Sequence, residues 1–208
     1  MLVCFALEDE ARAFRKLVAG RGEVSILITG IGRRKAEQAV RGFLAGNTPS
    51  QVLSCGFAGG LNPALQTGAV IFATNDATLE IALTGAGARA AQFSCAPRIA
   101  TTVAEKAALR QATGADAVEM ESAAIHEACR QRGIPCATVR VISDAAGENL
   151  PLDFNRLANA DQSLNYRKLA WAIATTPGKI PALIQLQKNC RLAAEQLATV
   201  LLKACASS

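Results

Sequence analysis

The clearest fold signal lies in residues 1–55, which read MLVCFALEDEARAFRKLVAGRGEVSILITGIGRRKAEQAVRGFLAGNTPSQVLSC. The apolar runs at 2–7, 24–29 and 51–55 are typical of strands. Residues 8–19 open with three acidic side chains and residues 33–44 follow a Gly-Ile-Gly turn, so both stretches are predicted to be helices. This β-α-β-α-β order predicts a parallel sheet with right-handed crossovers.

The chain continues this alternation to about residue 142. We expect a glycine-rich turn at 56–61, strands at 69–74, 78–83, 115–120 and 136–142, and helices at 104–112 and 122–132. After a loop at 150–154, helices are expected at 165–175 and 180–204. The last helix is amphipathic, which predicts packing on the sheet, with a membrane-surface role as the alternative. No second domain or repeat is visible, so residues 1–208 are predicted to form a single domain.

Composition favours an α/β protein and argues against several functions. Half of the residues are hydrophobic but only 4% are aromatic, which suits parallel strands covered by helices. The net charge of +5 is scattered apart from Arg33-Arg34-Lys35, and a single Trp and a single Tyr leave little to stack on bases, so we expect no nucleic-acid partner. Seven cysteines without CxxC spacing and a single histidine predict reduced thiols and no metal site.

The apolar runs also bear on location. The N-terminal run is too short for a signal peptide, and no run approaches the roughly 20 residues that a membrane span needs. We therefore expect a cytoplasmic protein with no integral membrane segment.

Polar or glycine-rich clusters follow successive predicted strands. In open parallel sheets, ligands bind at the carboxyl ends of the strands, so the recurrence of these clusters predicts a site at that edge. The clusters are Glu8-Asp9-Glu10, Gly30-Ile31-Gly32, residues 56–60, Glu119-Met120-Glu121 and Ser143-Asp144.

The Gly30-Ile31-Gly32 turn also resembles the start of a dinucleotide-binding fingerprint. The third glycine of that fingerprint is replaced by Lys35, and no acidic residue follows about 20 positions later. A nicotinamide-dependent oxidoreductase is therefore disfavoured.

The carboxylates of Glu119 and Glu121 flank Met120 at a strand end. If the strand continues, both point to one face; if the chain already turns, one reaches a ligand while the other caps the next helix. A carboxylate suits vicinal sugar hydroxyls because it accepts two hydrogen bonds at once. Arg140, inside an apolar strand, needs an ionic partner, and we expect Glu119 or Glu121.

Two further polar residues have ordinary structural readings. Asp144 follows the strand at 136–142, and its structural alternative is a turn or helix-capping residue. His126 falls in the middle of a helix, where we expect a partly exposed residue rather than a catalyst.

Together these motifs resemble the nucleoside phosphorylase and nucleosidase superfamily, above all methylthioadenosine/S-adenosylhomocysteine nucleosidases and hopanoid-associated phosphorylases. The matching stretches span residues 6–144, about two thirds of the chain, and residues 150–155 and 177–181 look most like the hopanoid-associated branch. The most specific of them are residues 117–122, AVEMES, and 139–144, VRVISD. The resemblance implies a single-domain, three-layer αβα fold with a mixed, mostly parallel central sheet.

The resemblance also implies roles for individual residues. Asp144, helped by Ser143, would donate a proton to purine N7, and Glu10 would position or activate the attacking water. Glu121 would bind the ribose hydroxyls, Met120 would pack on the sugar, and Arg140 would brace the acidic site by balancing Glu119 or Glu121, which leaves Asp144 free to hold a proton. The other substrate-binding residues implied are Glu119, Phe57, Ala58, Gly59, Ile99, Ala100 and Phe154, with residues 98–102 serving the base mostly through backbone groups.

Two departures from the family pattern affect the expected reaction. Phe57 stands where the family usually has Ser or Thr, whose hydroxyl helps to hold phosphate or the nucleophilic water. The segment between the glycine turn and Glu119 is short, which predicts an open pocket able to take a bulky 5′ substituent.

The expected function is therefore cleavage of the N-glycosidic bond of an adenosine-type nucleoside. The cleavage would pass through an oxocarbenium-like state, and protonation of the base would make it a better leaving group. No cofactor is expected, although phosphate is a candidate co-substrate, and the resemblance implies a homodimer. The alternatives are release of adenine from a lipid-linked adenosine such as adenosylhopane, by an enzyme peripheral to the membrane, and a nucleoside-binding protein without catalysis.

Overall fold

The predicted β-α-β-α-β unit is present in the computed structural model, which describes residues 1–157, 159 and 165–206. It consists of β1 (Leu2–Phe5), α1 (Glu8–Leu17), β2 (Ser25–Ile28), α2 (Arg33–Gly46) and β3 (Val52–Gly60). β1 lies between β2 and β3 and pairs with both in parallel, so Leu2 is level with Ser25 and with Val52. The order and type of all five predicted elements are confirmed.

The rest of the sheet is built around β8 (Cys136–Asp144), which runs parallel to β3. On the other side of β8, β4 (Val70–Thr74) pairs antiparallel with it and β5 (Arg89–Ala90) extends the edge. β7 (Ala117–Glu119) pairs antiparallel with the end of β3, and β6 (Phe93–Cys95) pairs with β7. Among the described residues this makes an eight-stranded mixed sheet with mostly parallel pairs, which confirms the predicted α/β fold.

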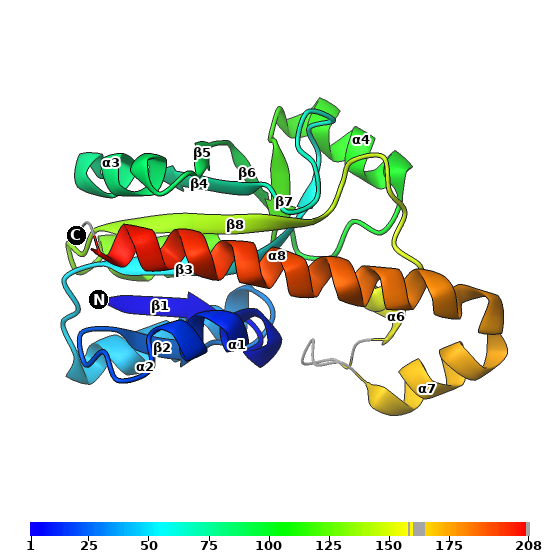
Figure 1. Cartoon of the computed structure of the whole chain (residues 1–208), viewed down its shortest axis with the longest axis horizontal. Coiled ribbons are helices and arrows are strands. Elements are labelled where there is room, and N and C mark those ends of the chain that lie inside the picture. The colour runs from blue at the N-terminus through cyan, green and yellow to red at the C-terminus, as the bar shows by residue number, and fades with distance from the viewer. Residues whose placement is uncertain (158, 160–164, 207–208) are drawn as a thin grey trace.

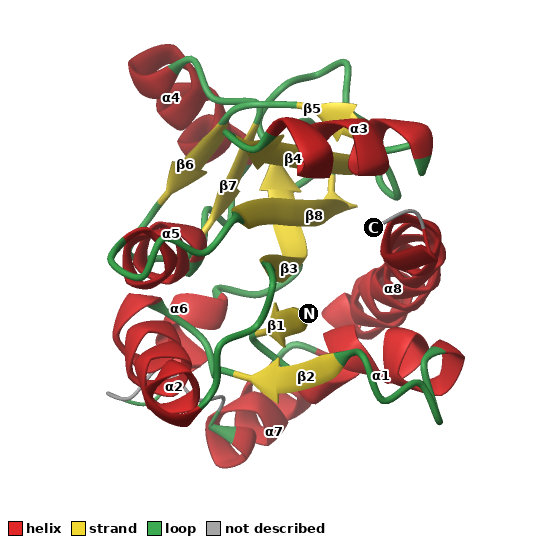
Figure 2. Ribbon diagram, turned by 90° about the vertical axis from the view of Figure 1, so that its left-hand side faces the viewer, coloured by secondary structure: helices red, strands yellow, loops and turns green. Residues whose placement is uncertain are grey.

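Helices cover both faces of this sheet (Figure 2). α1, α3 (Ala77–Gly85) and α8 (Ile180–Ala206) lie on one face, and α2 and α5 (Ser122–Arg130) lie on the other. The two-residue period of β1 explains both cores, because Val3 and Phe5 enter one hydrophobic cluster whereas Leu2 and Cys4 enter the other. The remaining helices are α4 (Val103–Thr113), α6 (Phe154–Leu157), α7 (Tyr166–Thr175) and the short 3₁₀ helix η1 (Pro177–Lys179).

The prediction of a strand at 78–83 is wrong, because these residues belong to α3. Asp76 caps this helix by accepting a hydrogen bond from the backbone N–H of Leu79 at 2.9 Å. Leu79, Ala82 and Leu83 are its buried residues, and their spacing of three and four residues is that of a helical stripe.

The predicted turn at 56–61 is also wrong, because β3 continues through the glycines to Gly60. Gly60 allows close packing here, since a Cβ atom at this position would lie 3.3 Å from the backbone N of Ala146. β8 likewise runs on to include Ser143 and Asp144. Both strands therefore carry their polar or glycine cluster within the sheet rather than in a loop.

α8 has two halves in different surroundings. The buried residues of this helix all fall between Ala193 and Ala204, where it packs on the sheet as predicted. The first half projects beyond the sheet toward α7 and α6 (Figure 1). Among the described helices, none has the length and apolar character that crossing a membrane requires.

Candidate active site

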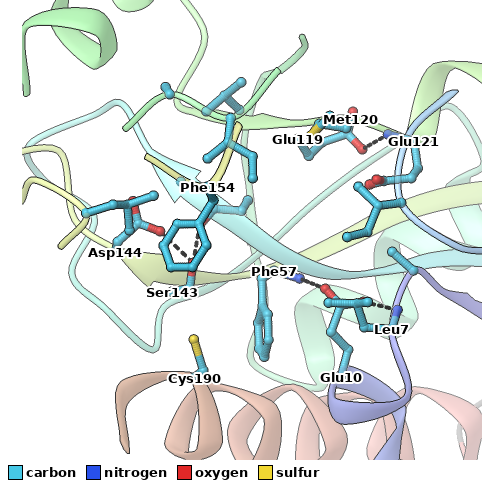
Figure 3. A pocket seen from close by; sticks show the side chains of 18 of the residues that line it. Leu7, Glu10, Phe57, Glu119, Met120, Glu121, Ser143, Asp144, Phe154 and Cys190 are labelled. Atoms are coloured by element: carbon cyan, nitrogen blue, oxygen red, sulfur yellow. Dashed lines mark hydrogen bonds between the residues drawn. The ribbon is translucent and has the colours of Figure 1, made fainter. Parts of the chain in front are cut away.

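The strand ends named above meet at a single pocket (Figure 3). β1, β2, β3 and β8 are parallel, so the segments at their carboxyl ends reach the same edge of the sheet. Of the predicted site residues, all except Arg140 line this pocket: Glu10, Phe57, Ala58, Gly59, Ile99, Ala100, Glu119, Met120, Glu121, Ser143, Asp144 and Phe154. Their individual roles stay predictions.

Glu10 is buried at the start of α1 and held by two backbone N–H groups. Its Oε1 accepts a hydrogen bond from Phe57 N at 2.8 Å, and its Oε2 accepts one from Leu7 N at 2.9 Å. A Cβ atom at Gly56 would lie 2.7 Å from Glu10 Oε1, which explains a glycine at that position of β3. Burial raises the pKa of Glu10 to about 7, so the group can act as a base near neutral pH.

Glu119 forms the predicted ion pair with Arg140, whose Nη2 lies 2.7 Å from Glu119 Oε2. The same carboxylate accepts hydrogen bonds from Ser122 N at 2.8 Å and from Ser122 Oγ at 2.6 Å, and thereby caps α5. Burial alone would raise the pKa of Glu119, but the Arg140 charge and the Ser122 hydrogen bonds outweigh it and leave that pKa lowered. Both oxygens of Glu119 thus have partners within the protein.

The chain turns after Glu119, so Glu121 has different partners. Its Oε1 accepts a hydrogen bond from the backbone N–H of Gly32 at 2.8 Å, and its Oε2 lies 3.6 Å from Arg140 Nη2. Burial raises the pKa of Glu121 despite the attraction of Arg140. The Gly30-Ile31-Gly32 turn therefore serves to orient Glu121, because Gly32 at φ +89° presents its N–H to the carboxylate.

Asp144 has an ionic partner that the sequence did not predict, because Lys106 of α4 pairs with it. Lys106 is fully buried, and its Nζ lies 2.5 Å from Asp144 Oδ2. The ammonium also donates to the backbone oxygens of Ala145 at 2.8 Å and Glu148 at 2.9 Å. Ser143 Oγ donates to Asp144 Oδ1 at 2.6 Å, so both oxygens of the carboxylate are engaged.

Sequence reasoning missed Lys106 because a lysine in a helix is normally on the surface. Its neighbours in α4 are exposed or half-buried, and nothing in the local pattern of this helix predicts a buried ammonium.

The predicted base site at 98–102 lines the pocket, but its backbone is largely occupied. Asn155 donates through Nδ2 to Ile99 O at 2.9 Å and accepts from Ile99 N through Oδ1 at 2.9 Å. Thr101 N donates to Glu105 at 2.8 Å. The backbone groups of Ile99 and the N–H of Thr101 thus have partners within the protein, and the contacts of this segment to a base stay a prediction.

One side of the pocket is apolar. Phe57 lies between Glu10 and Cys190 in Figure 3, and Phe154 lies near Ser143 and Asp144. The lining also includes the apolar residues Leu7, Leu150 and Leu186 together with Cys190, which were not among the predicted site residues. The site therefore combines a carboxylate-bearing sheet edge with an apolar wall supplied by α6 and α8.

His126 lies outside this lining. It is half-buried in α5 and its Nε2 lies 2.9 Å from Thr138 Oγ1. In the part of the chain that the structure describes, no group of three His, Cys, Asp or Glu side chains is placed to hold a metal ion.

Comparison with known proteins relates the chain to the phosphorylase superfamily and to nucleosidases. The family model of the phosphorylase superfamily matches residues 8–98 and 92–174. A 5′-methylthioadenosine/S-adenosylhomocysteine nucleosidase from Marinomonas sp. is 30% identical over 167 residues, which cover 64% of this chain and 72% of that protein.

Solved structures share the fold. A Neisseria meningitidis 5′-methylthioadenosine/S-adenosylhomocysteine nucleosidase in complex with methylthio-immucillin-A superposes with a TM-score of 0.74 at 20% identity, covering 100% of this chain and 98% of the other. Futalosine hydrolase of Helicobacter pylori superposes with a TM-score of 0.75 at 15% identity, covering 100% and 97% of the two chains.

Proposed function

The chain belongs to the phosphorylase superfamily, and from this premise we propose that it cleaves the N-glycosidic bond of an adenosine-type purine nucleoside and releases the base. The observation that carries the proposal is the gathering of Glu10, Glu121 and Asp144 around one pocket, each carboxylate held by different partners. The reaction needs no cofactor. A cytoplasmic location and a homodimer belong to the proposal as well.

The three carboxylates suit three separate tasks. Positive charge develops on the sugar as the bond breaks, and a proton on the purine makes it a better leaving group. Asp144, held by Ser143 and Lys106, is the acid at the base, and Lys106 stabilises the carboxylate that remains after the proton has gone. Glu121 binds the ribose hydroxyls, with Met120 against the sugar.

Glu10 is the base that activates the attacking water, and its titration supplies a test. We expect turnover to fall as the pH drops through about 7, because Glu10 must be a carboxylate to accept a proton. Its folded-state pKa is raised above the ordinary 4.5, so the folded chain binds this proton more tightly than the unfolded chain. The free energy of unfolding contributed by Glu10 should therefore decrease as the pH rises from about 4.5 to about 7.

Turnover and chemical denaturation between about pH 5 and pH 8 measure both effects. Glu10→Gln should be nearly inactive and should lose this part of the pH dependence of stability. Wild-type turnover that stays constant across this range would contradict the role of Glu10.

Phe57 supports hydrolysis rather than phosphorolysis. Its ring lines the pocket beside Glu10, at the position where a hydroxyl would help to hold phosphate. We expect methylthioadenosine to give adenine and free methylthioribose at the same rate with and without phosphate. Chromatography of the products is the measurement, and Phe57→Ser is the companion variant because it restores a hydroxyl. A sugar 1-phosphate as the main wild-type product would show phosphorolysis, and tight binding without turnover would indicate a nucleoside-binding protein.

A lipid-linked adenosine is the second candidate substrate. The observation in its favour is the apolar wall formed by Leu150, Phe154, Leu186 and Cys190, which suits an apolar 5′ substituent. Turnover of adenosines with 5′ alkyl chains of increasing length compares the two substrates, because kcat/KM should rise with chain length only if this wall binds the substituent.

A further inference from the structure

The helical projection formed by α7, η1 and the first half of α8 has no core of its own. Among its described side chains, at residues 165 and 167–192, none is buried. Four of the large exposed hydrophobic residues of the chain lie here, with Trp171 at 71%, Leu192 at 59%, Ile184 at 48% and Ile180 at 39% exposure. Such a concentration of exposed apolar side chains on one projection marks a contact surface.

The exposed residues of α8 follow one line along the helix. Ile180, Ile184, Lys188 and Leu192 are spaced by four residues, and Arg191 flanks the line. Leu186 and Cys190 of the same helix are half-buried and line the pocket. This half of α8 is therefore a wall with the pocket on one side and an apolar, basic stripe on the other.

The projection also carries the excess positive charge of the molecule. Residues 165–192 contain five basic side chains, Arg167, Lys168, Lys179, Lys188 and Arg191, and no acidic one. The net charge of the whole chain is +5, so acidic and basic residues balance elsewhere. On α7, Arg167 and Lys168 lie one helical turn from Trp171.

We propose that the exposed surface of this projection, called here the α7–α8 face, docks on an anionic lipid membrane through the α8 stripe, with the exposed residues of α7 beside it in the chain. We define the face by its exposed basic and large apolar residues: Arg167, Lys168, Trp171, Lys179, Ile180, Ile184, Lys188, Arg191 and Leu192. A bilayer interface accepts all of these groups, since isoleucine and leucine enter the apolar region, tryptophan lies at the headgroup level and lysine and arginine attract anionic lipids.

Two other occupants fit less well. A two-fold contact between copies would place this face against itself and oppose its basic side chains with the same side chains, of which Arg191 is paired with Glu195 at 3.2 Å. A nucleic acid would satisfy the charges, but it would leave the Ile180, Ile184 and Leu192 stripe in water. The charge and the apolar stripe together therefore favour lipid.

Trp171 supplies the test, because it is the only tryptophan in the chain. The full-length protein is titrated with phosphatidylcholine vesicles and with vesicles that also contain phosphatidylglycerol, and tryptophan emission and co-sedimentation are followed. We expect a blue shift and co-sedimentation with the anionic vesicles alone, weakened by added salt. The double variant Lys188→Glu/Arg191→Glu should bind these vesicles at least tenfold more weakly, and Ile184→Ser/Leu192→Ser should suppress the blue shift.

The matched controls lie on other faces. Arg33→Glu/Arg34→Glu changes the charge by the same amount on α2, and Ile81→Ser removes an apolar side chain that is 74% exposed on α3. Both should bind vesicles like the wild type. All four variants should cleave soluble methylthioadenosine as the wild type does, so this readout checks the fold independently of lipid.

Three results would overturn the proposal. The first is no binding of the wild type to anionic vesicles, and the second is an equal loss in the control variants. The third is a dimer, seen by light scattering, that Lys188→Glu/Arg191→Glu dissociates, because the face would then be an interface between copies. Vesicle binding by a protein that turns over no nucleoside would leave this proposal standing and defeat the proposed function.

Discussion

Asp144→Asn is expected to lower the turnover of methylthioadenosine on the order of 1000-fold, the scale of a lost general acid. The amide keeps the shape of the side chain and its hydrogen bond with Ser143, but it has no proton to give to the purine. The loss should shrink for nucleosides whose base leaves without protonation. Single-turnover kinetics on a series of leaving groups is the measurement.

Because Asp144 is paired with Lys106, a second variant is needed to separate an effect on chemistry from an effect on folding. The single substitution also leaves the buried Lys106 ammonium without its counter-ion, so reduced folding could imitate reduced chemistry. Asp144→Asn/Lys106→Met removes both charges and should regain stability while it stays inactive. Near-normal turnover by either variant would exclude Asp144 as the acid.

Lys106→Met is expected to destabilise the fold by about 3–5 kcal/mol, as typically found when one member of a buried ion pair is removed. The methionine fills similar space, but Asp144 Oδ2 then has no cation, and the backbone oxygens of Ala145 and Glu148 lose their donor. Urea denaturation of the wild type, both single variants and the double variant forms a thermodynamic cycle. The double variant should lose clearly less than the sum of the single losses.

A surface lysine offers the comparison for this cycle. Lys188→Met, on the exposed part of α8, should change the free energy of unfolding by no more than about 0.5 kcal/mol. Additive losses in the cycle would show that the ion pair is not the unit that stabilises this corner of the site.

Local patterns were sufficient to predict most elements of the sheet. Alternating strand and helix signals in residues 1–55 led to the correct order of the first five elements, and the parallel topology correctly predicted that distant strand ends share one edge. The prediction of a strand at 78–83 was wrong because the apolar run there resembles a strand. The signals for a helix were the Asp76 cap and the spacing of the buried residues. The predicted end of β3 at residue 55 was too early. Glycine usually ends a strand, but here the glycines permit close packing within it.

Most site contacts that join separate elements could not be predicted from the sequence. An ionic partner for Arg140 was predictable, since a charged residue inside an apolar strand needs one, and the sequence offered Glu119 or Glu121; the structure shows Glu119 at 2.7 Å. The Lys106–Asp144 pair and the Asn155–Ile99 bonds were not, because each depends on how a helix lies against a loop. The periodicity of α8 predicted an amphipathic helix. It did not predict that only the second half of this helix packs on the sheet.

The position of β8 has a consequence for how the nascent chain folds. This strand lies between β3 and β4, yet it is the last strand of the sheet to be synthesised. Until residue 144 has left the ribosome, β3 and β4 each lack this neighbour, and their unpaired edges can associate with other chains. Overexpression should therefore give inclusion bodies at high synthesis rates and more recoverable protein at low temperature. Chains that stop before β8 should aggregate rather than form a smaller domain.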